Sequence, residues 1–456
     1  MKKSMMMMIP FALLPFGHIA YAAKQFVVVD GYNYIYTVSD GCATIVNETT
    51  VWERPFYIRA INPTPVGMFT IPSVLGGYPV TSLGNAAFAD CKDMTHVTIP
   101  NSVTTIGDRV FAGCERLTSV TIPNSVTTIG AGAFGGCKAL TQVTIPNNVT
   151  FIGASAFASC SGLTSMIIPN SVTSIGDSTF CGCKALTGVT IGEGVTSIGD
   201  SAFVYCGRLT SVTIPNSVTN VGQQAFAICS ELRTVTIGAG VTSIGHHAFK
   251  DCTSLKDIII ATTNFHLPPS YSSSWIFTGY TTRPVNAVFL DGVQTITGGL
   301  VYHTVRSVTI PSSVTTIGKY AFNGCAYLKS ITIPPSVTTI GRSAFFGCSG
   351  LTSVTIPPSV TTIGDRAFAC CRGLTSMTIP KGVTSIGDEA FQDCQNLREV
   401  FIKGDAPSAG MSIYITTHQD LTTYVLKGSK GWDGNPNSTE LPATSTWRGK
   451  KIAYSK

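Results

Sequence analysis

The sequence predicts a repeat solenoid, in which short units stack on one another along one axis. A 23-residue unit recurs through most of the 456-residue chain, and one complete copy runs from Leu117 to Ala139. Cysteine marks one place in each copy, at Cys91, Cys114, Cys137, Cys160, Cys183, Cys206, Cys229 and Cys252, and then at Cys325, Cys348, Cys371 and Cys394. A fixed period of this length indicates a solenoid, because one unit cannot bury its own apolar face alone.

Each unit contains one predicted β-strand, such as Val120-Thr121-Ile122. Val120 and Ile122 are two residues apart, so both face inward while Thr121 faces outward. Pro123 ends the strand because it has no N–H to donate. We expect the same strand at Ile99, Ile145, Ile168, Ile191, Ile214, Ile237, Ile260, Ile310, Ile333, Ile356, Ile379 and Ile402, with Leu290 in the isoleucine place between Ile260 and Ile310, and a last strand at 422–426.

The second half of each unit predicts a turning return path. Val126 and Ile129 are three residues apart, which favours a turn or a 3₁₀ piece over a second regular strand. Gly130 is expected to let the backbone reverse, and Asp residues such as Asp200 are expected to cap a short helical turn. Phenylalanine then recurs as an expected stacked spine, at Phe134, Phe157, Phe180, Phe203, Phe226, Phe249, Phe322, Phe345, Phe368 and Phe391.

Four segments are expected along the chain. Residues 1–22 resemble a signal peptide, with a basic start, a short apolar stretch and a small-x-small end; a membrane anchor is the competing interpretation. Residues 23–66 predict a β-rich N-terminal cap with a hairpin around Asp-Gly. Residues 67–402 form the solenoid, interrupted by an irregular insertion at 261–286, and residues 403–456 form a C-terminal cap.

The composition argues against several classes of function. Charged residues are 12% of the chain, the formal net charge is +6, and no basic stripe is evident along the repeats, so nucleic acid is not an expected partner. The adjacent His246 and His247 lack further ligands at suitable spacing, so no metal site is expected. No nucleophile elbow, zinc-protease motif or phosphate loop is present. We therefore expect neither enzymatic activity nor a cofactor.

The fifteen cysteines allow two interpretations. An exported chain usually pairs its cysteines in disulfides. Twelve of these cysteines, however, share one inward repeat position, and identical side chains in a stack point the same way, which opposes the ~90° torsion of a disulfide. A buried ladder of reduced thiols is therefore the favoured prediction, and disulfides remain the alternative.

The complete unit, Leu-x-x-Val-x-Ile-Pro-x-x-Val-x-x-Ile-Gly-x-x-Ala-Phe-x-x-Cys, resembles the BspA-like class of bacterial leucine-rich repeats over residues 67–402. The flanking segments 40–45 and 404–407 are also similar to that family. The resemblance implies a leucine-rich-repeat horseshoe or superhelix, with one parallel β-sheet on the concave side, short 3₁₀ or α turns on the return side and β-rich caps. It also implies a secreted or cell-surface protein, and members are associated with adhesion to host matrix, host cells or other bacteria.

Two surfaces are candidate ligand-binding sites. The first is the outward threonine column, represented by Thr121, Thr144, Thr213, Thr236, Thr332 and Thr355. Its alternative explanation is that threonine simply favours strands and solvates the sheet. The second is the aromatic part of the insertion, with Tyr271, Trp275, Phe277 and Tyr280, which could instead be a packed bulge.

The function that these features predict is a non-enzymatic secreted or surface adhesin that recognises extracellular protein or glycan through the repeat surface. Its alternative is a structural coat or extracellular-matrix protein that has no specific ligand. Saturable binding of an extracellular ligand would distinguish the two.

Overall fold

The computed structural model describes residues 23–46, 61–262, 264–266, 284–298, 305–410, 412–433, 437–442 and 446–455. The expected signal peptide lies outside these residues. The chain divides into two compact units: unit 1 comprises residues 1–232 and 245–253, and unit 2 comprises residues 233–244 and 254–456. Each unit is a parallel β-solenoid, which confirms the fold class that the repeat predicts.

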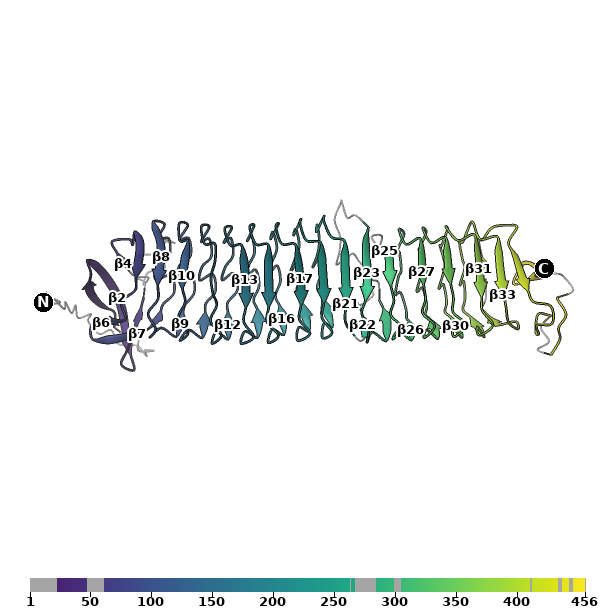
Figure 1. Ribbon diagram of the computed structural model, residues 1–456, viewed down its shortest axis with the longest axis horizontal. Helices are drawn as coiled ribbons and strands as arrows, with labels where there is room; N and C mark the ends of the chain where they lie inside the picture. The colour runs from purple at the N-terminus through teal and green to yellow at the C-terminus, as the bar shows by residue number, and fades with distance from the viewer. Residues whose placement is uncertain are drawn as a thin grey trace, which may run out of the picture. The chain divides into compact units, whose positions relative to one another are not determined.

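Unit 1 carries two rows of parallel strands, one long and one short (Figure 1). The long strands form the sheets β5-β8-β10 and β13-β15-β17, with bounds β5 Gly67–Thr70, β8 Met94–Thr98, β10 Ser119–Thr121, β13 Ser165–Ile168, β15 Gly188–Ile191 and β17 Ser211–Ile214. The short strands are ordered β9-β11-β12-β14-β16-β18, at Thr105–Ile106, Thr128–Ile129, Phe151–Ile152, Ser174–Ile175, Ser197–Ile198 and Asn220–Val221. Partners are 23 residues apart, as in Thr98 with Thr121.

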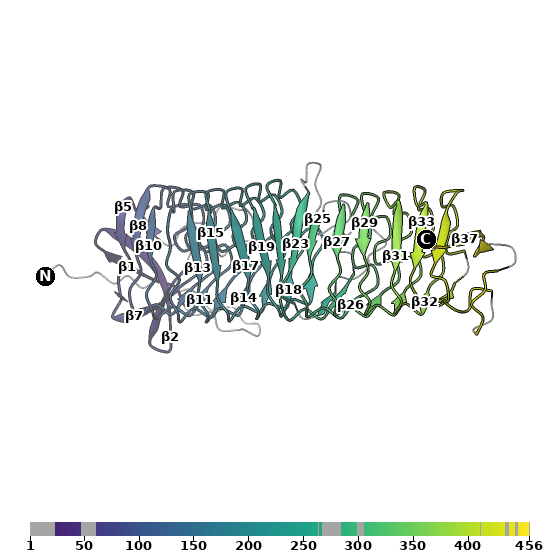
Figure 2. The same cartoon turned by 45° about the vertical axis from the view of Figure 1, so that its right-hand side comes forward.

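Unit 2 repeats the two-row arrangement (Figure 2). Its long strands are β19 Thr234–Ile237, β21 Asp257–Ile260, β23 Val285–Phe289, β25 Val305–Thr309, β27 Ser330–Thr332, β29 Ser353–Thr355, β31 Ser376–Ile379, β33 Glu399–Ile402 and β35 Thr422–Val425. Its short strands are β20 Ser243–Ile244, β22 Asn264–His266, β24 Thr295–Thr297, β26 Thr316–Ile317, β28 Thr339–Ile340, β30 Thr362–Ile363, β32 Ser385–Ile386 and β34 Ser408–Ala409. The strand expected at 422–426 is confirmed as β35.

The core of each unit consists of columns of identical side chains. The expected phenylalanine spine is confirmed, because Phe203 is fully buried and its ring lies 5.1 Å from Phe180 and 5.0 Å from Phe226 between ring centroids. The twelve in-phase cysteines are buried beside it. The Sγ of Cys114, for example, donates to the carbonyl of Phe88, 3.2 Å away. A column places the same apolar group at every step, so each repeat covers the apolar face of the one before it.

The expected 3₁₀ or α turns on the return side are wrong for the described residues, none of which lies in a helix. The short run Thr128–Ile129 is instead a true strand paired on both sides. In the preceding repeat, Arg109 follows the short strand Thr105–Ile106 and has a left-handed φ of 54°, which interrupts a right-handed helix. The N–H groups of Arg109 and Phe111 donate to carbonyls of the next repeat, at Ala131 and Ala133. Bonds between repeats therefore alternate with local turn bonds, such as the one from the Ala112 N–H to the carbonyl of Arg109 at 3.0 Å, and no helix forms here.

Two expected local roles are also corrected. The Oδ1 of Asp200 accepts the backbone N–H of Gln223 at 2.7 Å, so it joins two repeats and does not cap its own turn. Gly130 is not among the residues with positive φ. A Cβ at Gly130 would instead lie 2.5 Å from the carbonyl carbon of Gly107. Glycine is needed here because the backbones of adjacent repeats approach too closely for any side chain.

The degenerate repeat has a different register from the one expected. Phe289, and not Leu290, pairs with Ile260 and takes the isoleucine place. Phe289 is 2% exposed, whereas Leu290 is 40% exposed and stands where other repeats have proline. Inside the interval 261–286, strand β22 pairs with β24, and β23 begins at Val285. These strands continue the two ladders of unit 2 at the edges of the interval.

Antiparallel strands occur at the chain's two described ends. The hairpin expected around Asp40-Gly41 is present as β2 (Tyr32–Ser39) and β3 (Cys42–Ile45), and β1 (Gln25–Val29) pairs with β2. In unit 2 the parallel ladder continues through β35 to β37 (Lys450–Tyr454), which also pairs with β36 (Thr446–Trp447). Remaining unit 1 strands are β4 Ile61–Asn62, β6 Val74–Leu75 and β7 Tyr78–Leu83.

Candidate functional site

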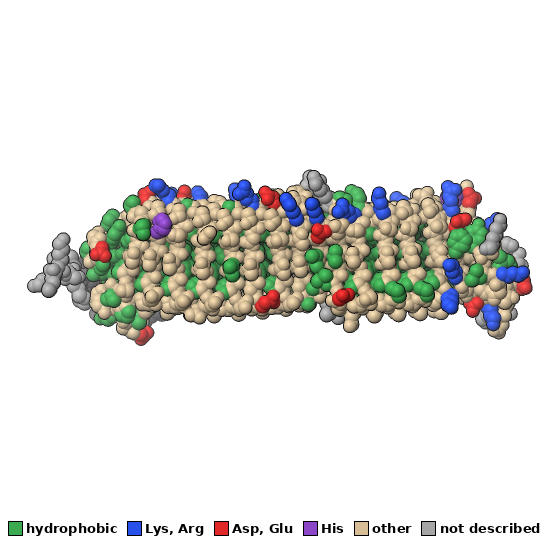
Figure 3. Space-filling view, viewed as in Figure 1, with side chains coloured by type: hydrophobic (Ala, Val, Ile, Leu, Met, Phe, Trp, Pro, Cys, Tyr) green, Lys and Arg blue, Asp and Glu red, His purple; other side chains and the backbone are tan. Residues whose placement is uncertain are grey.

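The outward side of the long strands, here called the strand face of each unit, carries the threonine column. Thr121, Thr213, Thr332 and Thr355 are exposed on long strands, and Thr236 is half-buried. Thr144 is also exposed, but the strand expected at Ile145 is not formed, because residues 141–146 belong to no strand. Pairing aligns Thr98 with Thr121 in unit 1 and Thr332 with Thr355 in unit 2. Figure 3 shows one side of the molecule as mostly uncharged polar side chains and backbone.

The hydroxyl groups of this column have no hydrogen-bond partner among the described residues. This sets them apart from threonines that stand immediately before several of the long strands, whose hydroxyls donate to the previous repeat. Thr187 Oγ1, for example, donates to the carbonyl of Thr164 at 3.0 Å. Each outward hydroxyl therefore offers one donor and two acceptor positions to a ligand or to water.

The structure adds an aromatic pair that the sequence reasoning missed. Phe401 and Tyr424 occupy the outward column on β33 and β35, next to Thr378 on β31. Their rings stack with centroids 4.9 Å apart, and both side chains are half-exposed. The alternation in Val400-Phe401-Ile402 was the available signal, because it places Phe401 outward between two inward residues.

Four basic residues in unit 2 were missed as well. These are Arg233, Lys256, Arg306 and Lys329, which are exposed and lie at the starts of β19, β21, β25 and β27. Their sequence separations are irregular because of the degenerate repeat, so only the strand register brings them together. The expectation of no basic stripe therefore does not hold for this part of unit 2.

The aromatic candidates of the insertion, Tyr271, Trp275, Phe277 and Tyr280, lie outside the described residues. Their role in ligand binding stays a prediction.

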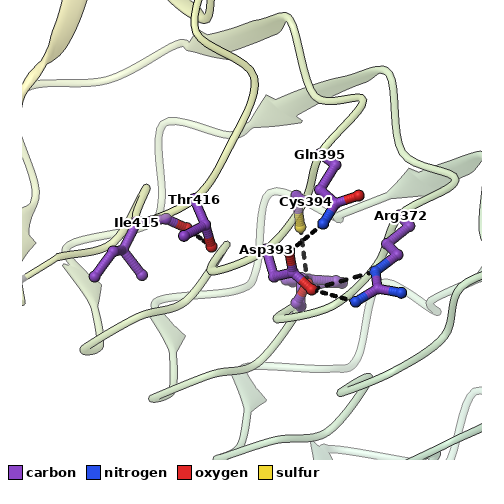
Figure 4. A network of polar contacts seen from close by, with 7 residues as sticks. Arg372, Asp393, Cys394, Gln395, Ile415 and Thr416 are labelled. Carbon is purple, nitrogen blue, oxygen red and sulfur yellow. Dashed lines mark hydrogen bonds and ion pairs between the residues drawn. The ribbon is translucent and has the colours of Figure 1, made fainter.

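Ion pairs between adjacent repeats are structural clamps and not candidate sites. Arg372 donates from Nη2 to Asp393 Oδ2 at 2.6 Å, and Gln395 Nε2 donates to Asp393 Oδ1 at 2.6 Å (Figure 4). The hydrogen bond from Arg372 lowers the pKa of the Asp393 carboxyl below its ordinary value. A carboxylate that is satisfied in this way holds two repeats together and is poorly suited to proton transfer.

Buried thiols such as those of Cys160 and Cys252 are equally unsuited to chemistry. Burial raises the pKa of Cys160 to about 12, and it raises the pKa of Cys252 in the same way. A thiol with so high a pKa remains protonated at neutral pH, and only the thiolate is a good nucleophile or metal ligand. No group of three His, Cys, Asp or Glu side chains that could hold a metal ion occurs among the described residues.

We expect thiol labelling to separate the fifteen free cysteines into two classes. In the folded protein without reductant, the half-exposed Cys42, Cys181 and Cys370 should react first. The twelve buried thiols should react only after denaturation, when all fifteen become countable. Disulfides among the twelve, or fast labelling of them in the folded protein, would contradict the buried ladder.

None of the described residues forms a helix that is long and apolar enough to span a membrane.

The repeats of this chain match those of a known family. The family model for the BspA-type leucine-rich repeat region matches residues 70–170, 150–272 and 300–417. No curated protein matches the chain.

One solved structure has a likeness to this chain at the level of the fold, and two others are similar in sequence along most of its length. A leucine-rich repeat protein from Bacteroides ovatus ATCC 8483 is 24% identical, with a TM-score of 0.54, over 94% of this chain and 99% of that one. A leucine-rich cell surface protein from Faecalibacterium prausnitzii A2-165 is 27% identical, with a TM-score of 0.44, over 95% and 96% of the two chains. The pneumococcal vaccine antigen PcpA is 16% identical, with a TM-score of 0.31, over 96% and 100%.

Proposed function

Because the chain belongs to the BspA-type leucine-rich repeat family, we propose that it is a non-enzymatic binding protein, secreted or held at the cell surface. Its ligands are extracellular proteins or glycans, and it recognises them through the strand faces. The signal-peptide-like residues 1–22 support the location. The aromatic residues of the insertion, Tyr271, Trp275, Phe277 and Tyr280, are proposed as a second contact surface.

One observation carries this proposal: the outward hydroxyls have no hydrogen-bond partner in the described part of the chain, and the strands beneath them are paired with their neighbours. Thr121 and Thr213 lie between buried neighbours on either side in the strand, so the backbone beneath each hydroxyl is fixed. A ligand that bonds to such a surface loses little free energy to ordering of the protein. Neighbouring rungs lie ~4.8 Å apart, so the same groups recur at regular spacing.

The test is equilibrium binding of residues 23–456 to immobilised extracellular-matrix proteins, purified glycans and bacterial cells. We expect saturable binding to at least one of these. Denatured protein at the same concentration is the control for nonspecific adsorption. No saturable binding to any of them would reject the proposal and favour a structural coat protein without a specific ligand.

A further inference from the structure

A row of four basic side chains follows the strand starts of unit 2. Arg233 and Lys256 stand immediately before β19 and β21, and Lys329 stands immediately before β27. The backbone N–H of Lys256 donates to the carbonyl of Arg233 at 2.9 Å, and that of Asn286 donates to the carbonyl of Lys256 at 2.7 Å. These bonds place Arg233 and Lys256 on consecutive rungs, and the rung of β23 follows them. Arg233, Lys256, Arg306 and Lys329 are here called the basic row.

Arg306 joins the row through a register shift. Val285 pairs with Val305 and Asn286 pairs with Ser307, so Arg306 is the extra residue of the bulge. Its Nε donates to Asn286 Oδ1 at 3.0 Å. The guanidinium therefore lies toward the rung of β23, which has the apolar Val285 where a basic residue would stand. The bulge thus fills the gap in the row.

Asn286 is held in place by three contacts. Its Oδ1 also accepts the Ser307 hydroxyl at 2.6 Å, and its Nδ2 donates to Asp257 Oδ1 at 2.7 Å. The Arg306 contact uses Nε alone, and no hydrogen bond to a described residue uses its Nη groups. The two Nη groups are thus available to a ligand, while the arm that carries them is fixed.

The basic row differs from the other basic residues whose partners are known. Arg116 pairs with Asp93, Lys138 with Glu115, Arg366 with Glu389 and Arg372 with Asp393, each in an adjoining repeat. No member of the row forms an ion pair with a described residue. The carboxylates closest in sequence are Glu231 and Asp257, and Asp257 accepts from Asn286.

We propose that the basic row binds an acidic polysaccharide of the sulfated class. This inference deepens the proposed function, on which it rests, by naming a ligand class for one part of the surface. Rungs are ~4.8 Å apart, so the row from β19 to β27 spans about 19 Å in single file and matches a linear polyanion. Arginine and lysine both bind sulfate-like oxyanions through charge-assisted hydrogen bonds.

The side chains beside the row favour a sugar polymer over a nucleic acid. The outward positions next to it are Thr234, Asp257, Asn286, Ser307 and Ser330. The hydroxyl groups of Thr234, Ser307 and Ser330 and the amide of Asn286 complement the hydroxyls of a polysaccharide. Asp257 is the one carboxylate among these positions, and it accepts a hydrogen bond from Asn286. Binding of single-stranded nucleic acid depends on aromatic side chains that stack on the bases, and this row of neighbours contains none.

The test uses residues 23–456 and heparin as the sulfated probe, with binding measured at about 0.15 M salt and at higher salt. We expect heparin to bind at least ~10-fold more weakly, and with a shallower salt dependence, to the variant that combines Arg233→Gln, Lys256→Gln, Arg306→Gln and Lys329→Gln. A matched control variant removes the same charge from exposed positions outside the row. It combines Lys184→Gln, Arg208→Gln, Lys381→Gln and Arg398→Gln. The control should bind within about twofold of the parent.

Equal losses of heparin affinity in both variants would show that net charge alone explains the binding, and would overturn the proposal. The proposal would also be overturned if the parent protein did not bind heparin. Tighter, row-dependent binding of single-stranded DNA than of heparin would assign the row to another polymer and also overturn it. Variants in which outward threonines of the strand face are replaced separate this inference from the proposed function. If these variants lose binding of other ligands but still bind heparin, the results support both the proposed function and the basic-row proposal. If they still bind every ligand, only the proposal of a binding site on the strand face is contradicted.

Discussion

Replacing Phe203 with alanine is expected to lower the free energy of unfolding by about 3–5 kcal/mol. The ring is fully buried and is stacked between Phe180 and Phe226, at 5.1 and 5.0 Å. The hydrogen-bonded backbones of the adjoining repeats keep these rings apart, so the cavity cannot collapse easily. Urea unfolding followed by circular dichroism measures the change, and the loss should appear as an earlier local transition because solenoid stability is partly local.

The matched control is Phe151→Ala, which removes the same side chain from an exposed place. Phe151 is 50% exposed on β12, so its loss should cost less than about 1 kcal/mol. If the two variants shift the transition equally, the phenylalanine column is not the core of unit 1.

The second large effect is expected from Gly222→Ala, at about 1–3 kcal/mol or more. A Cβ at this position would lie 2.5 Å from the carbonyl carbon of Gly199 and 2.6 Å from the backbone nitrogen of Asp200. Neither atom is the end of a flexible side chain, so one repeat must move away from the other. Gly222 also donates its N–H to Ile198 at 2.8 Å, and this bond would lengthen. Thermal unfolding measures the loss.

Gly188→Ala is the matched control for that substitution. Nothing lies within 4 Å of a Cβ at Gly188, which is in strand β15. Alanine there should be neutral or should stabilise the protein by up to about 1 kcal/mol, since glycine weakens a strand. Destabilisation by both substitutions alike would show that close approach between repeats is not the reason for glycine at position 222.

The long strands and their core could be predicted from the sequence because two kinds of periodicity agree. The 23-residue period gives the stacking, and the alternation in Val120-Thr121-Ile122 gives the inward and outward sides. Strand β35 follows from the same rule.

The return side could not be predicted in this way. Thr128–Ile129 is only two residues long, too short for alternation to show, and it is a strand because repeats on both sides bond to it. The left-handed conformations of Arg109 and Ser155 fall on residues that seldom adopt them, so neither residue marks its own turn. In the degenerate repeat, Leu290 and Phe289 are both apolar, and only pairing with Ile260 decides between them.

The surface was predictable to different degrees. The outward orientation of Thr121 follows directly from the alternation of the strand, although its role in binding remains a prediction. The basic row was hidden because a 29-residue repeat step and a bulge separate Lys256 from Arg306 in sequence. A fixed period cannot align residues across such a step, whereas backbone pairing does.

The central claim is that the strand faces bind the ligand, and a comparison of two triple variants tests it most directly. The first variant changes exposed outward residues of long strands, by Thr121→Glu, Thr213→Glu and Thr355→Glu. The second changes exposed residues of the return side, by Thr127→Glu, Thr196→Glu and Thr361→Glu. Both triples add the same charge. Binding to the ligand that the screen identifies should weaken at least ~10-fold for the first triple and less than about twofold for the second. Equal affinities for both triples, with both still folded, would contradict the claim.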